Sequence, residues 1–146
     1  MRADSFAHFA NYIDQQSSDY GSSAFSYYGG KSLNEQSHGE SFLSLFQNRF
    51  TNQGIYILDE PEAALSPQRI LSFMVIMKEL AKSGNAQFII STHSPILMAM
   101  PDAQFLYISE DEVNEMNYKD TEHYQITKSF LDNPERMLRY LFENEE

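Results

Sequence analysis

The sequence predicts an α/β fold in which a parallel β-sheet is flanked by helices. Residues 55–58 form an unbroken apolar run with β-branched and aromatic members, which is typical of a central strand buried on both faces. A helix with one apolar face follows, and residues 87–91 read as a second short strand. A strand, a helix and a strand in this order form a βαβ unit with a right-handed crossover, so we expect the two strands to be parallel.

The helix between these strands has clear signals at both ends. Ser66 is a suitable N-cap, and Pro67 can occupy the first helical position. Gly84 is placed to end the helix as its C′ residue. The apolar positions recur at helical spacing and define one face; they are Ile70, Phe73, Met74, Met77, Leu80 and Ala81. We therefore expect this helix, residues 67–83, to cover one face of the sheet.

Two acidic residues, Asp59 and Glu60, follow the first strand directly. Burying an unpaired charge costs roughly several kcal/mol, so packing of the strand does not explain the two acids. Open parallel sheets bind ligands at the carboxyl ends of their strands. The second strand runs into Thr92 and His93, so we expect Asp59, Glu60 and His93 to meet at this edge. The alternative is that the two acids simply face water.

The segment before the first strand contains a second candidate site. Residues 41–50 are amphipathic and predict a helix, which Ser37, His38, Gly39 and Glu40 precede. The N–H groups at a helix N-terminus can bind a phosphate. Alternatively, Ser37 is only an N-cap and Glu40 completes a capping box.

Residues 1–30 carry the weakest signals of the chain. A short amphipathic helix and then a loop rich in Ser, Tyr and Gly are expected there. Gly30, Lys31 and Ser32 match the end of a phosphate-binding P-loop, G-x-x-x-x-G-K-[ST], but Phe25 stands where the first glycine is required. No apolar strand precedes this segment, so it does not form a Walker A motif.

The C-terminal third predicts further short elements. They are a helix over residues 95–100, a third strand of the parallel sheet over 104–108, an edge strand over 113–118, and helices over 121–131 and 134–142. Glu122 and His123 are adjacent on a helix and therefore point in different directions. We expect them to be helix surface or capping residues and not metal ligands.

Composition restricts the classes of function. The 146 residues suit one domain, and there are 21 acidic against 10 basic residues, a net charge of −11. Such an acidic chain lacks the basic surface that binds a phosphate backbone, so direct nucleic-acid binding is disfavoured. No apolar run reaches the length of a membrane helix, and the absence of cysteine is compatible with the cytoplasm.

Together, three motifs resemble a known family. The stretch ILDEP followed by EAALS is similar to the Walker B strand and D-loop of ATP-binding-cassette (ABC-type) ATPases, and STHSP resembles their switch-histidine loop. SHGE resembles the ABC signature in the form found in SMC and RecF-like ATPases. The resemblance covers roughly residues 29–142, the motifs occur in the family's order, and small bacterial predicted ATPases of this group are the most similar.

The resemblance implies roles for these residues in ATP hydrolysis. Asp59 would hold Mg²⁺ through water, Glu60 would be the general base, and His93 would contact the γ-phosphate. Ser37, His38, Gly39 and Glu40 would bind the nucleotide held by a second subunit, because ABC-type sites form across a head-to-tail dimer. Ala64, Leu65 and Ser66 would belong to the D-loop, where Ser66 replaces the usual aspartate.

The missing Walker A motif limits this interpretation. In the family the P-loop and the Q-loop precede the signature, so residues 31–146 resemble the C-terminal part of an ABC-type domain. The chain is then expected to hydrolyse ATP only with an N-terminal half, or with a Walker A-bearing partner, and to form a homodimer or higher oligomer. The alternatives are a non-catalytic interaction domain and, more remotely, an unrelated metal-dependent hydrolase.

Overall fold

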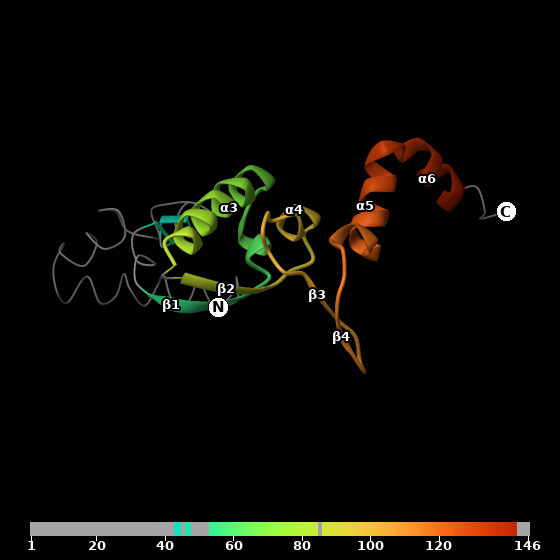
Figure 1. The fold of residues 1–146 in the computed structure, drawn as a ribbon. Coiled ribbons are helices and arrows are strands. Elements are labelled where there is room, and N and C mark those ends of the chain that lie inside the picture. Colours follow the sequence, from blue (N-terminus) through green and yellow to red (C-terminus); the bar gives the residue numbers. More distant parts are fainter. Residues whose placement is uncertain (1–42, 45, 48–52, 85, 143–146) are drawn as a thin grey trace, which may run out of the picture. The chain divides into compact units, whose positions relative to one another are not determined.

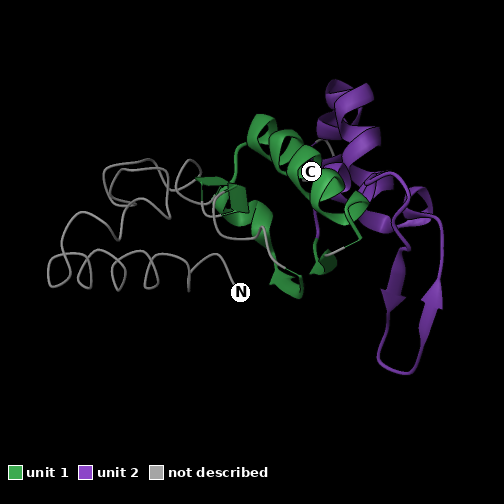
Figure 2. Ribbon diagram, turned by 60° about the vertical axis from the view of Figure 1, so that its left-hand side comes forward, with its two compact units in different colours: residues 1–92 green, residues 93–146 purple. Residues whose placement is uncertain are grey.

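The computed structural model describes residues 43–44, 46–47, 53–84 and 86–142 (Figure 1). The chain divides into two compact units, residues 1–92 and 93–146 (Figure 2). The expected N-terminal helix and loop, residues 25–32 and residues 37–40, which resemble a signature motif, lie outside the described residues.

The first unit is organised by a pair of parallel strands. Strand β1 (Gly54–Asp59) pairs with β2 (Ala86–Ser91), and the register runs from Gly54 opposite Ala86 to Asp59 opposite Ser91. The predicted parallel arrangement is confirmed. Within the described residues this sheet has two strands.

Helix α3 (Pro67–Lys82) connects the two strands, and Figure 1 shows it lying over one face of them. The predicted helix is confirmed, and it ends one residue earlier than the expected range 67–83. The Ser66 hydroxyl accepts a hydrogen bond from the Arg69 N–H at 3.4 Å, and Pro67 occupies the first turn. Gly84 has φ +74°, the left-handed conformation that commonly ends a helix.

The core of the first unit lies between α3 and the inner face of the sheet. Along both strands the side chains alternate between more buried and exposed positions, as the period of a strand requires. Tyr56 stacks on its cross-strand partner Phe88 with ring centroids 5.3 Å apart. Phe73 of α3 is fully buried against Phe46, with ring centroids 4.7 Å apart. Among the residues of this unit that the structure describes, the buried core side chains include Phe46, Leu58, Leu65, Ile70, Phe73, Ile76 and Met77.

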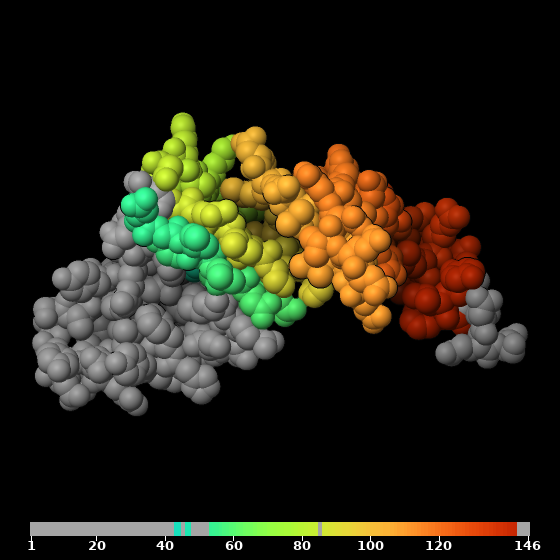
Figure 3. All heavy atoms as spheres, turned by 60° about the horizontal axis from the view of Figure 1, so that its bottom comes forward, coloured from blue at the N-terminus to red at the C-terminus, as the bar shows by residue number. Residues whose placement is uncertain are grey.

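The other face of the sheet is exposed. Ile55 and Ile57 are each 64% exposed and Ile89 is 52% exposed. Figure 3 shows β1 and β2 side by side at the molecular surface. The prediction that β1 is buried on both faces is therefore wrong, because α3 covers only one face and no described element covers the other.

The second unit is built from short elements. Its order is α4 (Pro95–Met98), β3 (Leu106–Ile108), β4 (Val113–Glu115), the 3₁₀ turn η4 (Tyr118–Asp120), α5 (Glu122–Asp132) and α6 (Pro134–Phe142). The two predicted C-terminal helices are confirmed. Thr121 caps α5, and Asn133 accepts a hydrogen bond from the Arg136 N–H at 3.0 Å at the start of α6.

The prediction that residues 104–108 form a third strand of the parallel sheet is wrong. Strand β3 pairs with β4 in the antiparallel direction, in a sheet of its own. The connecting turn explains this pairing. The Ser109 N–H donates to the Glu112 carbonyl at 2.9 Å, and the Ser109 hydroxyl accepts from the Glu112 N–H at 3.3 Å. A connection this short joins antiparallel strands, since parallel neighbours need a longer crossover.

Thr121 fixes the start of α5 against α4 in the second unit. It is 3% exposed, and its hydroxyl lies 3.9 Å from the Met98 sulfur. The same hydroxyl donates to the Tyr118 carbonyl at 2.6 Å and accepts from the Tyr124 N–H at 3.3 Å. One small side chain thus joins α4, η4 and the first turn of α5.

The two faces of β1 should respond differently to substitution. Leu58→Ala removes a side chain that is 3% exposed, and we expect the free energy of unfolding to fall by about 2–5 kcal/mol. Ile57→Thr changes an exposed side chain and keeps its β-branching, so we expect a change within about 0.5 kcal/mol. Urea unfolding of both variants measures the difference, and similar losses at the two positions would contradict the assignment of the exposed face.

Candidate functional site

The two acids lie at the carboxyl end of the parallel strand pair. Asp59 is the last residue of β1, it is half-buried, and it lies opposite Ser91. The Glu60 N–H donates a hydrogen bond to the Ser91 carbonyl at 2.9 Å, so the pairing extends one residue past the strand. Asp59 and Glu60 therefore lie at the edge of the sheet where the sequence predicts a site.

Glu60 has an unusual backbone conformation. Its φ and ψ are 47° and 53°. These angles lie in the left-handed region, which residues other than glycine rarely adopt. This residue turns the chain from β1 into the 3₁₀ turn η3 (Pro61–Ala64), and Pro61 is fully buried there. Such strain is found most often at functional sites, where the surroundings hold it in place. Glu60 is thus distinguished by its backbone as well as by its carboxylate.

Glu62 is held by the residue that follows β2. The Thr92 hydroxyl donates to Glu62 Oε1 at 2.7 Å, and both side chains are half-buried. Glu62 is therefore an acid with a tertiary partner. The bond connects η3 to the end of β2, and sequence reasoning missed it because the two residues are far apart in the chain.

Residues 64–66, which resemble a D-loop, have structural roles in this fold. Ala64 is half-buried at the end of η3, Leu65 is buried in the core, and Ser66 is the exposed N-cap of α3. Serine and aspartate are about equally good N-caps. A serine at position 66 therefore starts the helix as well as an aspartate would.

His93 begins the second unit and contacts a second histidine. Its Nδ1 lies 3.0 Å from Nε2 of His123, the ring centroids are 4.7 Å apart, and both side chains are exposed. The sequence interpretation gave His123 a place on a helix surface or at a cap, and no local pattern indicated that it contacts His93. The expected meeting of His93 with Asp59 and Glu60 stays a prediction, as His93 belongs to the other unit.

The donor set at the sheet edge is compatible with Mg²⁺. Asp59 supplies a half-buried carboxylate, and Mg²⁺ in phosphoryl-transfer sites is held by one or two carboxylates, by water and by the phosphates of the substrate. Among the described residues there is no group of three or more acidic or histidine side chains that could hold a metal ion alone. The residues present therefore fit a Mg²⁺ that arrives with a nucleotide.

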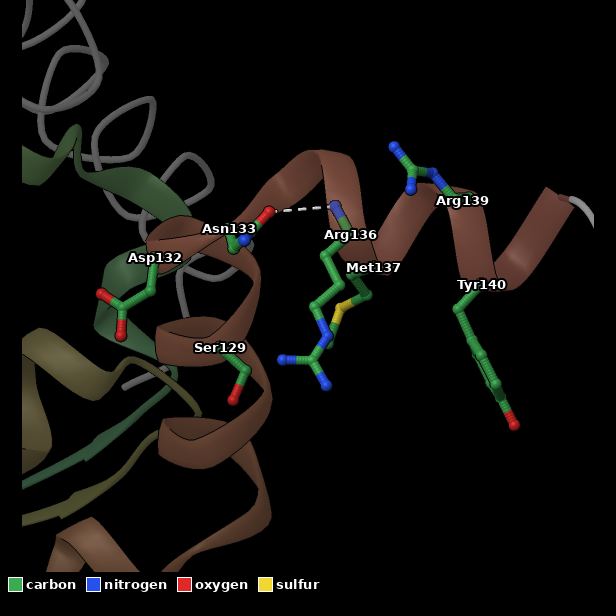
Figure 4. Close-up of a pocket in the computed structure, with 7 residues that line it drawn as sticks. All are labelled: Ser129, Asp132, Asn133, Arg136, Met137, Arg139 and Tyr140. Atoms are coloured by element: carbon green, nitrogen blue, oxygen red, sulfur yellow. Dashed lines mark hydrogen bonds between the residues drawn. The ribbon is translucent and has the colours of Figure 1, made fainter.

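A hollow between α5 and α6 is a less convincing ligand site. It is lined by Ser129, Asp132, Asn133, Arg136, Met137, Arg139 and Tyr140. Figure 4 shows the guanidinium groups of Arg136 and Arg139 pointing to opposite sides of α6. Asp132 is bonded to Lys128 at 2.5 Å, and this hydrogen bond raises the pKa of Lys128. Because the two cationic groups do not converge, the hollow does not form an anion site.

The backbone strain at Glu60 leads to a prediction about stability. At ordinary positions glycine is less stable than alanine by about 0.5–1 kcal/mol. In the left-handed conformation the Cβ of alanine costs about 1–2 kcal/mol. We therefore expect Glu60→Gly to unfold at higher urea concentration than Glu60→Ala. The ordinary order, with alanine more stable, would show that position 60 does not have a left-handed backbone in solution.

The hydrogen bond between Thr92 and Glu62 leads to a second prediction. Thr92→Val keeps the shape of the side chain but removes the donor to a half-buried carboxylate, so we expect a loss of about 1–2 kcal/mol of unfolding free energy. Thr92→Ser keeps the hydroxyl and is the matched control. If valine proved as stable as serine in urea unfolding, the bond would contribute nothing to the fold.

Part of the chain matches a known protein family. Residues 35–99 match the family described as AAA domain, putative AbiEii toxin, Type IV TA system. The match includes β1, Asp59, Glu60, α3, β2 and His93. No curated protein matches the chain. Among the described residues, no helix has the length and apolar character to cross a membrane. Residues 35–99, somewhat less than half of the chain, are accordingly similar to an AAA domain.

Proposed function

We propose that this chain provides the hydrolytic part of an ATPase of the ABC/RecF-like group. The observation that carries the proposal is the pair Asp59 and Glu60 at the carboxyl end of β1, with Glu60 held in a left-handed backbone conformation. The relationship of residues 35–99 to AAA-type ATPases supports it. The resemblance of the Walker B, D-loop and switch-histidine segments gives the finer assignment.

Each acid has a separate role in the proposed reaction. Glu60 accepts a proton from the water whose oxygen attacks the γ-phosphorus, while the bond to the bridging oxygen breaks and ADP leaves. Asp59 holds Mg²⁺, through water, at the phosphates. When bound, Mg²⁺ neutralises negative charge on the phosphate oxygens. The N–H of Glu60 is held by the Ser91 carbonyl, which keeps the backbone of the base in place.

The remaining proposed contacts come from other segments. His93 contacts the γ-phosphate, and it follows β2 by two residues. Ser37 and Gly39, with His38 and Glu40, bind the nucleotide of a second subunit. These roles rest on the resemblance.

The phosphate cradle has to come from elsewhere. A P-loop supplies the backbone N–H groups and the lysine that hold the phosphates, and Phe25 replaces its first glycine in this sequence. We therefore propose a Walker A-bearing segment in the same reading frame, or a partner protein, and assembly into a dimer or higher oligomer. The exposed side chains of Ile55, Ile57 and Ile89 support association, since exposed apolar patches commonly mark interfaces.

A non-catalytic interaction domain is the second candidate function. Two features favour this candidate, the exposed apolar face and the absence of a P-loop. Both are expected in a domain that kept the fold and lost the reaction. The two candidates differ in what they require of Glu60, since only catalysis needs its carboxylate.

The test uses the chain combined with the Walker A-bearing segment encoded upstream or beside it. Glu60→Gln should lower the ATPase turnover at least 100-fold, equivalent to about 2.7 kcal/mol of barrier, because it removes the base and keeps the shape. ATP binding should be retained, and an ATP-bound dimer should accumulate in size-exclusion chromatography with light scattering.

Glu79→Gln is the matched control, because Glu79 is an exposed acid on α3. It should leave turnover unchanged. Equal losses at positions 60 and 79 would contradict the role of Glu60. Combined chains that bind each other but do not hydrolyse ATP would favour the interaction domain.

A further inference from the structure

Two histidines from distant parts of the second unit share a hydrogen bond. Nδ1 of His93, just before α4, lies 3.0 Å from Nε2 of His123, in the first turn of α5. The rings are tilted by 56°. This is an N–H···N distance within the range of normal hydrogen bonds, so one of the two nitrogens carries a proton and the other accepts it.

The backbone on each side of this pair is anchored. Ser94, next to His93, caps α4 by accepting from the Leu97 N–H at 3.5 Å. Thr121, two residues before His123, is buried against Met98 of the same helix α4. The two histidines are therefore attached to elements that contact each other, and their approach follows from the packing of α4 and α5.

The hydrogen bond determines which nitrogen of His93 can face a nucleotide. Because Nδ1 is engaged by His123, a contact of His93 with a phosphate has to use Nε2. A phosphate oxygen accepts hydrogen bonds, so Nε2 must carry the proton. In a neutral imidazole, Nδ1 is then the acceptor, and Nε2 of His123 is the donor between the rings.

We propose that His123 is a positioning residue for His93, which holds the ring and keeps its proton on Nε2 for the γ-phosphate. The proposal rests on the function proposed above. The partner of a functional histidine ring commonly sets its tautomer and orientation, as carboxylates and carbonyls do for metal-binding histidines. Here a second imidazole takes that part, from a segment outside the residues 35–99 that match the AAA-type family.

The pair can be tested directly by NMR on the 146-residue chain labelled with ¹⁵N. The spectra are recorded in mildly alkaline buffer. We expect a scalar coupling across the hydrogen bond between Nδ1 of His93 and Nε2 of His123, with the proton attached to His123. A proton on Nδ1 of His93, or no coupling, would overturn the proposal.

Activity of the chain combined with its Walker A-bearing segment provides the second arm. His123→Phe keeps an aromatic ring but removes the donor, and we expect kcat to fall by about 10-fold or more. His123→Gln keeps an N–H donor and should recover most of the loss. In a His93→Ala background, His123→Phe should have no further effect, because positioning acts only through His93. Additive losses, or no rescue by glutamine, would overturn the positioning role.

The two arms separate failure of this proposal from failure of the proposed function. If the combined wild-type chains hydrolyse ATP but the NMR coupling is absent, only the role of His123 is lost. If they do not hydrolyse ATP, the proposed function fails and a role of His123 in hydrolysis fails with it, while the coupling still decides whether the pair exists. Circular dichroism of both His123 variants confirms that they are folded.

Discussion

The register of the two parallel strands is the constraint on which the candidate site depends. With Asp59 opposite Ser91 and the Glu60 N–H bonded to the Ser91 carbonyl, β1 and β2 end at the same edge. A shift by one residue would turn every side chain of a strand to the other face, which would expose Leu58 and move Asp59 inward. At this edge, the 2.7 Å hydrogen bond from Thr92 to Glu62 connects the residue after β2 to the turn that follows β1. The pairing of β1 with β2 thus determines both how α3 packs on the sheet and where the two acids lie.

Local signals were sufficient to predict the elements that carry the site. Ser66 is predicted as the N-cap of α3, and the structure confirms this helix start, because capping depends on neighbouring residues only. The apolar run of β1 predicts a strand correctly, but it does not reveal how many of its faces are covered. The number of covered faces depends on elements that are distant in sequence. On the uncovered face, Ile55 and Ile57 are exposed. Likewise, the composition of β3 predicts a strand, but the short turn after it determines which strand it pairs with.

The contacts that sequence reasoning missed share one property. Glu62 with Thr92, and His93 with His123, each join residues separated by 30 positions. Neither pair has a periodicity or a motif of its own, since the pairing arises from tertiary packing. Motif spacing identifies Asp59, Glu60 and His93 as candidates, but the side chains that hold the loops around them come from the three-dimensional arrangement.

The left-handed backbone of Glu60 also bears on mutational drift. Glycine adopts this conformation without strain, and asparagine adopts it more readily than most residues. In a chain that no longer used the carboxylate, random substitution at this position would be biased toward those two residues, since both would add stability. A glutamate at position 60 is the less stable choice for the fold. The stability of the fold by itself therefore gives no reason for a glutamate at this position.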